Sequence, residues 1–405
     1  MMNPKDRQEP ICRNDKEFCN FDEIRTFNRR GLFVGGCPKS GTTLVLSLLD
    51  GHPKLVVLPE ETHFLDKRPH YLALDSYQAK SRWLLEESGL RLLAQGRFAR
   101  FGRSGEAPSA DLRDYGGFDH QRFTRLAAYS AEQPWINDSL LFSETVRAYA
   151  ITIGCNWRDC VRWVEKSTSN EACSDALFGL FPEAKLLQVV RDPRAVFASR
   201  KKRLLNISGC YSKAHRLLRG WNQSSRQILK LMERRDQYLV LRYEDLIQNP
   251  QESLEGVCRF IGIELLPELL APTRAGRQWE GNSSFHSAFN GISAQPVDYW
   301  KSELTADEIW WVEMHCRQGM LIAGYSLRTE GKFSFSRWLK RLPGESWGGY
   351  LRARRGSLCQ LAGLLEDCRY AAVPAGLQAG MLCRAISRVS SRAAASPARD
   401  RSPCA

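Results

Sequence analysis

Residues 31–50 read GLFVGGCPKSGTTLVLSLLD, and this stretch decides the fold class. The apolar run Gly31–Gly36 predicts a short buried strand, because no polar residue interrupts it. The segment Gly41–Asp50 predicts a helix that ends at Gly51. A glycine-rich turn joins the two segments, so a strand, a tight turn and a helix follow one another directly.

The same alternation of strands and helices continues along the chain. Short apolar runs predict further strands at Leu55–Leu58, Arg162–Lys166, Lys185–Val190 and Tyr238–Arg242. Helical patterns lie at Asn170–Phe181, Ala195–Lys202 and Gln251–Ile261, and a capping box at Thr305–Glu308 opens a helix to about Gly324. This alternation predicts a three-layer, P-loop-like α/β fold with a central parallel sheet flanked by helices.

Changes in composition divide the chain into three parts. Residues 1–27 are polar and predict a flexible leader, whereas residues 28–330 hold the regular pattern and predict one α/β domain. Inside this domain, residues 88–133 are rich in Gly and Arg and predict an insertion or lid. Residues 331–405 carry 13 basic and four acidic residues, which predicts a basic C-terminal extension. That extension would be solvated or would make weak peripheral contact with a membrane.

Composition and charge exclude several classes of protein. The 405 residues are 43% hydrophobic and 25% charged, which is typical of a globular protein. The first 330 residues hold 45 basic and 41 acidic residues, so we expect no binding to nucleic acid. No apolar run reaches the ~18 residues that span a bilayer, and the N-terminus lacks a signal peptide. Because the 13 cysteines are scattered, we expect a cytoplasmic protein with neither a disulfide framework nor a zinc site.

The turn at residues 35–43 has the chemistry of an anion-binding loop. It follows a strand and opens a helix, where backbone N–H groups and the helix dipole attract an anion. Gly41 gives the turn a compact backbone and Lys39 gives it a positive charge. The hydroxyl donors are Ser40, Thr42 and Thr43. It is not a Walker A sequence, because Thr42 stands where that motif requires lysine.

The residues Pro38–Thr43 (PKSGTT) resemble the 5′-phosphosulfate loop of the sulfotransferases that use 3′-phosphoadenosine 5′-phosphosulfate (PAPS). That family binds the nucleotide 3′-phosphate with an Arg and a Ser eight positions apart on a later turn between a strand and a helix. Arg191 and Ser199 have this spacing and follow the strand predicted at Lys185–Val190. The resemblance covers about residues 31–325, and it implies PAPS as co-substrate with no metal requirement.

The resemblance also implies roles for residues elsewhere in the chain. Tyr243 follows a predicted strand and matches a tyrosine near the nucleotide, and Ser284 lies in GNSSF, which resembles a closing loop of the family. The sequence Glu165-Lys166-Ser167 resembles the E-K-[ST] segment of the family. By that resemblance, Lys166 reaches the sulfonate or the acceptor, as Lys39 does from its loop.

The segment Pro59–Asp66 (PEETHFLD) combines two patterns of the same family. The tyrosylprotein branch has EET here, and the heparan 3-O-branch has E-x-H-F-x-D, each with a Glu as general base. Glu61 is therefore expected to take the proton of the acceptor, with His63 either orienting it or acting as the base itself. A histidine is the base in the cytosolic small-molecule branch, so both assignments stay open.

These residues predict transfer of the PAPS sulfonate to a hydroxyl or amine acceptor, either a carbohydrate, a peptide tyrosine or a small molecule. The arginines of residues 88–133 favour an anionic acceptor; they are Arg91, Arg97, Arg100, Arg103 and Arg113. Two other classes stay open. One is a P-loop kinase or NTPase, and the other is a non-catalytic module that binds nucleotides or polyanions.

Overall fold

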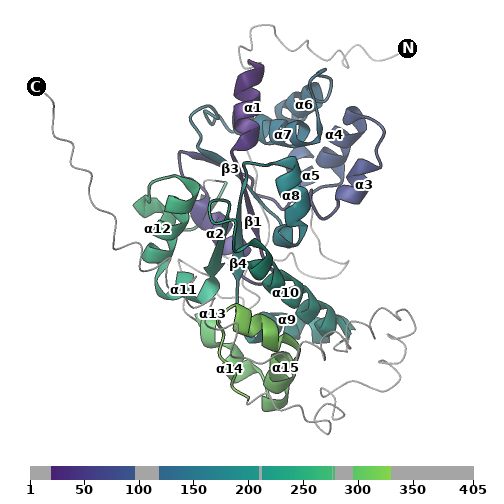
Figure 1. Ribbon diagram of the computed structural model, residues 1–405. Helices are drawn as coiled ribbons and strands as arrows, with labels where there is room; N and C mark the ends of the chain where they lie inside the picture. Colours follow the sequence, from purple (N-terminus) through teal and green to yellow (C-terminus); the bar gives the residue numbers. More distant parts are fainter. Residues whose placement is uncertain (1–19, 96–117, 209–211, 276, 279–294, 330–405) are drawn as a thin grey trace, which may run out of the picture. The chain divides into compact units, whose positions relative to one another are not determined.

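The computed structural model describes residues 20–95, 118–208, 212–275, 277–278 and 295–329. A five-stranded sheet lies at its centre, with strand order β2-β3-β1-β4-β5 (Figure 1). In chain order the strands are β1 (Gly31–Gly35), β2 (Leu55–Val57), β3 (Arg162–Lys166), β4 (Lys185–Val190) and β5 (Tyr238–Arg242). The sequence-predicted α/β fold, with a central parallel sheet flanked by helices, is confirmed.

The two adjacent strands β1 and β4 are the most deeply buried part of the sheet. All five residues of β1 are buried, and only the first residue of β4 is partly exposed. Strand β2 pairs in parallel with β3, with Leu55 opposite Arg162, and β4 pairs in parallel with β5, with Leu186 opposite Tyr238. Parallel strands of this kind read as continuous apolar runs, which is why their positions could be predicted from the sequence.

The chain forms two compact units. Unit 1 comprises Met1–Leu32, Gly51–Glu165 and Asp175–Ala184, and unit 2 comprises Phe33–Asp50, Lys166–Ser174 and Lys185–Ala405. The division runs through β1 and through the end of β3. The segment around Glu61 therefore belongs to unit 1, whereas the loop at residues 35–43 belongs to unit 2.

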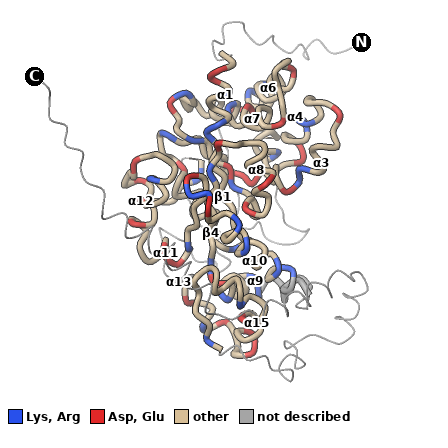
Figure 2. The backbone as a smooth tube through the Cα atoms, in the orientation of Figure 1, with Lys and Arg blue, Asp and Glu red and all other residues tan. Residues whose placement is uncertain are grey.

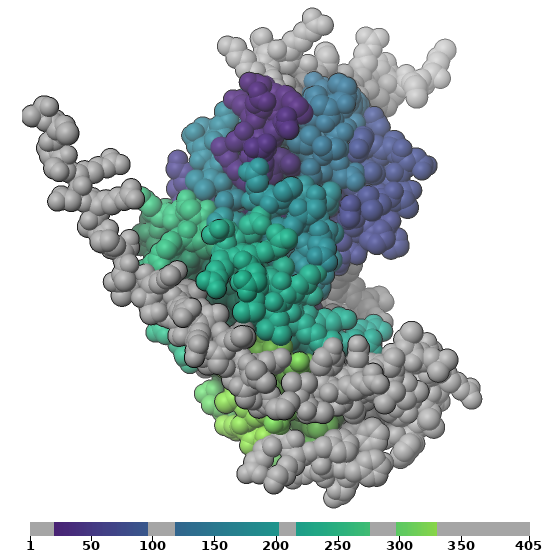
Figure 3. All heavy atoms as spheres, in the orientation of Figure 1, coloured from purple at the N-terminus to yellow at the C-terminus, as the bar shows by residue number. Residues whose placement is uncertain are grey.

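The helices of unit 1 include a group near its N-terminus that the sequence did not predict. Helix α7 (Asp138–Thr152) packs against both α1 (Phe21–Arg29) and α6 (His120–Ser130). In Figure 3 the purple atoms of α1 lie against the blue-teal atoms of these later helices. The other helices of the unit are α3 (Arg68–Leu72), α4 (Tyr77–Glu86), α5 (Arg91–Ala94) and α8 (Ser174–Leu180). The expected flexible leader thus differs from the structure over residues 21–27, which are helical.

Buried apolar side chains explain why α1 and α6 are regular helices. In α1, Ile24 and Phe27 are buried, and the Phe27 carbonyl accepts a hydrogen bond of 2.8 Å from Nε1 of Trp163. In α6, the buried residues follow helical spacing at Phe123, Leu126, Ala127 and Ser130. Residues 88–133 therefore contain a regular amphipathic helix in addition to α5. Their assignment as an insertion or lid stays a prediction, and residues 96–117 lie outside the described chain.

Unit 2 contains the helices that follow the phosphate-binding candidates. Helix α2 (Thr42–Leu49) begins at the loop, and α10 (Ser212–Leu231) packs against α9 (Pro193–Ser208) and α15 (Ala306–Ile322). The remaining elements are η2 (Asn170–Cys173), α11 (Tyr243–Gln248), α12 (Pro250–Ile261), η3 (Pro267–Leu270), β6 (Thr273–Arg274), β7 (Arg277–Gln278), α13 (Gln295–Asp298) and α14 (Trp300–Glu303). The predicted capping box of α15 is confirmed, with reciprocal bonds between Thr305 and Glu308 of 2.9 and 3.2 Å.

The described chain carries charges of both signs. Figure 2 shows Lys and Arg interspersed with Asp and Glu along the backbone. Across the described ranges, no helix combines the length and the apolar character needed to cross a bilayer. Ser284 and the basic extension at residues 331–405 lie outside these ranges, so their assignments stay predictions.

Candidate active site

The phosphate loop, residues 35–43, bends sharply between β1 and α2. Lys39 has φ 75° and Gly41 has φ 97°, so both residues adopt the left-handed conformation. A side chain at Gly41 would also collide with the Tyr243 ring, so this position requires glycine for two reasons. For Lys39 the conformation is costly, and such strain persists where surrounding contacts enforce it, often at functional sites.

The polar groups of the loop fit an anionic ligand. Ser40 is fully buried, and its hydroxyl oxygen has no hydrogen-bond partner among the described residues. Leaving a buried hydroxyl unpaired costs free energy, which an anion at the N-terminus of α2 would recover. Lys166, at the end of β3, donates a hydrogen bond of 3.3 Å to the Thr43 hydroxyl. Lys166 of the E-K-[ST] segment therefore contacts the start of α2, and its role toward the sulfonate or the acceptor stays a prediction.

Arg191 joins this loop to the turn after β4. Its Nη1 donates to the Lys39 carbonyl at 3.1 Å, and its Cζ lies 4.3 Å from the centroid of the Tyr243 ring. Burial raises the pKa of Tyr243, so its hydroxyl stays neutral. The structure thus brings Lys39, Arg191 and Tyr243 together. Ser199 lies on α9, two turns after Arg191, and is also buried.

A buried network holds the Arg191 turn in place. Arg194 pairs with Asp192 at 2.6 Å and with Glu313 of α15 at 2.6 Å, and its guanidinium lies 4.1 Å from the Trp300 ring centroid. Glu244 accepts a hydrogen bond from the backbone N–H of Asp192 at 3.0 Å. The sequence analysis did not identify these supporting residues. A charged run after a strand was visible, but partners 52 and 119 positions away leave no local signal.

The base segment, residues 59–66, places a histidine between two carboxylates. Nε2 of His63 lies 3.2 Å from Glu61, and Nδ1 lies 3.2 Å from Asp66. These hydrogen bonds, first to Asp66 and then to Glu61, raise the pKa of His63 to about 9. The imidazole is therefore protonated at neutral pH. His63 also has φ 55°, a second strained non-glycine backbone at a predicted site residue.

Three contacts fix the backbone around Glu61. The carboxylate of Glu165 accepts hydrogen bonds from the backbone N–H of Thr62 at 3.2 Å and from its hydroxyl at 2.7 Å. Phe64 stacks on Phe142 with ring centroids 4.4 Å apart. Gly89 approaches so closely that any side chain there would collide with the Glu61 carbonyl. Glu165 therefore holds the base segment, a role that its sequence position did not reveal.

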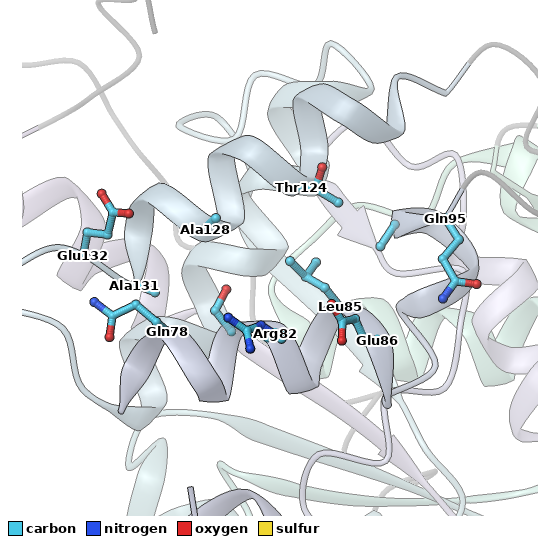
Figure 4. A pocket seen from close by; sticks show the side chains of 11 residues that line it. Gln78, Arg82, Leu85, Glu86, Gln95, Thr124, Ala128, Ala131 and Glu132 are labelled. Carbon is cyan, nitrogen blue, oxygen red and sulfur yellow. The ribbon is translucent and has the colours of Figure 1, made fainter. Parts of the chain in front are cut away.

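A hollow in unit 1 lies away from these residues. It has a volume of about 560 Å³ and lies between α4 and α6, where Figure 4 shows Leu85 of α4 pointing toward Thr124 of α6. None of the sequence-predicted site residues lines it. The candidate site residues are therefore those of the phosphate loop in unit 2 and of the base segment in unit 1, each described by itself. Within the described ranges, no group of three His, Cys, Asp or Glu residues could hold a metal ion.

Comparisons with known proteins agree with the residue patterns. The model of the sulfotransferase family matches residues 31–268. Protein-tyrosine sulfotransferase 2 of Gallus gallus is 26% identical over 239 residues, covering 57% of this chain and 51% of that protein. Carbohydrate sulfotransferase 1 of Mus musculus is 24% identical over 169 residues, which cover 35% of this chain and 39% of that protein. The chain spans about half the length, or less, of these relatives.

A solved structure is also similar. The sulfotransferase domain from the olefin synthase of Synechococcus PCC 7002 is 22% identical, with a TM-score of 0.48, covering 73% of this chain and 95% of that one.

The relatives correct one expectation, and the match to the family model shows the family. The expected cytoplasmic location is contradicted, because the tyrosylprotein and carbohydrate sulfotransferases that match this chain are Golgi membrane enzymes. The family match extends over more than half of the chain and includes the phosphate loop, the base segment and Arg191. The protein therefore belongs to the sulfotransferase family.

Proposed function

We propose that the protein is a sulfotransferase that moves the sulfonate of PAPS to a hydroxyl group of an acceptor. The phosphate loop carries this proposal, because a buried unpaired hydroxyl of Ser40 and two lysines, Lys39 and Lys166, gather at the start of α2. Membership of the sulfotransferase family supports the same reaction.

Residues of unit 2 would hold the donor. Bound PAPS supplies the sulfonate and leaves as 3′-phosphoadenosine 5′-phosphate (PAP). Residues 39–43 would bind the 5′-phosphosulfate, and Lys39 and Lys166 would place positive charge beside the sulfonate. Arg191 and Ser199 would bind the 3′-phosphate, while Tyr243 and Ser284 would contact the nucleotide. The sulfonate carries less charge than a phosphoryl group, so lysines can stabilise it without a metal.

Glu61 is the proposed general base. The neighbouring His63 is protonated at neutral pH because it lies between the Glu61 and Asp66 carboxylates. A protonated imidazole cannot accept another proton, which favours Glu61 as the group that deprotonates the acceptor. His63 then orients Glu61 through their hydrogen bond of 3.2 Å.

The acceptor is proposed to be a carbohydrate hydroxyl or a peptide tyrosine. The relatives are named for protein tyrosine and for carbohydrate, and both acceptors present a hydroxyl group. A kinase or NTPase is less favoured, because Thr42 occupies the position of the Walker lysine. A binding module without catalysis would not need the ordered carboxylate and imidazole of the base segment.

Two measurements test this function. Calorimetric titration of the full chain with PAP and with ATP should give tighter binding of PAP, because only PAP carries the 3′-phosphate that Arg191 and Ser199 would bind. Incubation with radiolabelled PAPS should then transfer label to at least one acceptor in a panel of glycans and tyrosine peptides. Tight binding of ATP alone would contradict the proposal, and PAP binding without transfer to any acceptor would favour the non-catalytic module.

A further inference from the structure

The turn between α7 and β3 brings two cysteines into contact. The sulfur atoms of Cys155 and Cys160 lie 3.5 Å apart. We propose that this pair is a redox site, in which the two cysteines form a reversible disulfide by exchange with a small disulfide of the glutathione class. The proposal concerns unit 1 alone and does not depend on the proposed transfer reaction.

The backbone of the turn favours this bond. Asp159 donates its N–H to the Asn156 carbonyl at 3.1 Å, which closes a four-residue turn with Cys155 and Cys160 on either side. The turn reverses the chain direction and so brings the two flanking residues together, as the 3.5 Å between the sulfur atoms shows. A disulfide requires the sulfurs to approach by about 1.5 Å more, to roughly 2.05 Å, which small side-chain rotations can supply.

The two thiols have complementary reactivity. Cys155 is partly exposed, and the hydrogen bond from Cys160 lowers the pKa of its thiol to about 7, so a large fraction is thiolate at neutral pH. Cys160 is buried, and its pKa is raised, first by the bond to Cys155 and then by burial. Cys155 is therefore the attacking thiol and Cys160 the resolving one.

The exchange takes place in two balanced steps. The Cys155 thiolate attacks oxidised glutathione, forming a mixed disulfide and releasing one glutathione thiolate. With Cys155 capped, the main cause of the raised Cys160 pKa is removed, so Cys160 can lose its proton to solvent and attack the Cys155 sulfur. The intrachain disulfide forms and a second glutathione leaves. The protein loses two electrons and two protons, and one glutathione disulfide is reduced to two thiols.

The position of the pair suggests what the bond would stabilise. The Cys160 carbonyl accepts a hydrogen bond of 2.6 Å from Arg30, and Val161 donates to the Lys54 carbonyl at 2.8 Å. The turn, which leads directly into β3 at Arg162, is thus attached to Arg30 before β1 and to Lys54 before β2. A disulfide across the turn would restrict the unfolded chain and fix the start of β3.

Peptide mapping tests the proposal directly. Trypsin cuts after Arg158, between the two cysteines, so a disulfide would join the peptides 148–158 and 159–162. The reduced full-length protein is incubated in glutathione buffers of increasing oxidised fraction, alkylated and digested. We expect the joined peptides to replace the two alkylated ones as the oxidised fraction rises, and to disappear on returning to reduced glutathione. Oxidation should raise the Tm by a few degrees.

Matched variants locate the effect. Cys155→Ser and Cys160→Ser should each abolish the joined peptides and the rise in Tm, whereas Cys173→Ser, which removes another partly exposed thiol, should retain both. The wild-type titration needs no variant to fold. Alkylation of both cysteines throughout the titration, or disulfides from Cys155 to other cysteines only, would overturn the proposal.

Discussion

The phosphate loop and the base segment differ in how far they are shielded from water. In the loop, Ser40 is fully buried and Arg191 is 7% exposed. In the base segment, the side chains of Glu61 and His63 are 32% and 31% exposed. Buried contacts hold the backbone of both regions, but the charges of Glu61 and His63 are partly screened by water, whereas Ser40 and Arg191 are shielded from it. Donor binding should therefore depend on fixed geometry, and deprotonation of the acceptor on a charge cluster that responds to pH.

The largest expected effect is on the base. Glu61→Gln keeps the shape of the side chain but cannot accept a proton, so kcat should fall by about 10²–10⁴-fold. The dissociation constant for PAP should not change, since Glu61 would not contact the nucleotide. Turnover at the wild-type rate in this variant, together with an inactive His63→Ala, would assign the base to the histidine instead.

A slightly smaller loss is expected in the loop. Lys39→Ala removes a preorganised positive charge beside the sulfonate and should lower kcat by about 10²–10³-fold. Lys39→Arg should lose less, because it keeps the charge. Steady-state kinetics with labelled PAPS measure both variants. If the alanine variant is fully active, the loop has a structural role only.

The rate should be sensitive to one methyl group added at Gly89, next to the backbone of the base segment. Gly89→Ala would push against the Glu61 carbonyl, and a displacement of about 1 Å at a reacting group can cost ~10²-fold in rate. PAP affinity should persist. Gly179→Ala is the matched control, because nothing lies within 4 Å of the added carbon there. Equal activity of the two variants would show that Gly89 does not position Glu61.

Nucleotide recognition should depend on Arg191. Arg191→Ala should weaken PAP binding by about 1.5–3 kcal/mol, as expected for hydrogen bonds to a charged group. Binding of adenosine 5′-phosphosulfate, which lacks the 3′-phosphate, should change much less. Calorimetry on the two nucleotides separates these cases, and an equal loss for both would mean that Arg191 supports the loop through the Lys39 carbonyl.

The smallest expected effect is on stability as a function of pH. The folded protein raises the pKa of His63 from 6.5 to about 9, so its charge stabilises the fold fully below pH 6.5. This stabilisation is lost as the pH rises through about 9. The Tm of the wild type should therefore fall more between pH 6.5 and 9.5 than that of His63→Asn. If the Tm of the two proteins changes equally with pH, His63 is not charged and stabilising in the folded protein.

The elements and the site differ in how well the sequence predicted them. The bounds of β3, β4 and β5 were predicted to the residue. For β4 the reason is that a buried parallel strand reads as an almost continuous apolar run. Helix α6 was not predicted, since it follows a Gly- and Arg-rich stretch that hid the spacing of Phe123, Leu126 and Ala127. Within residues 88–133, residues 120–130 form an ordinary packed helix.

The same contrast holds within the site. Lys39, Lys166 and Arg191 lie in short motifs with a fixed spacing, so the sequence could identify them. Their supports could not be found in this way: Glu165 acts on Thr62, and Glu313 on Arg194, over more than a hundred residues. Such contacts depend on packing, which a local pattern does not encode.

The strained backbones have a consequence for evolution in the laboratory. Of the four non-glycine residues with positive φ in the described chain, Lys39 lies in the phosphate loop, His63 beside the proposed base, and Ser169 next to the loop, where its N–H donates to the Gly36 carbonyl. Glycine would relax each position, so a selection for heat resistance alone would accept such changes readily. In a library screened only for stability, the selected variants would thus lose activity while they keep the fold.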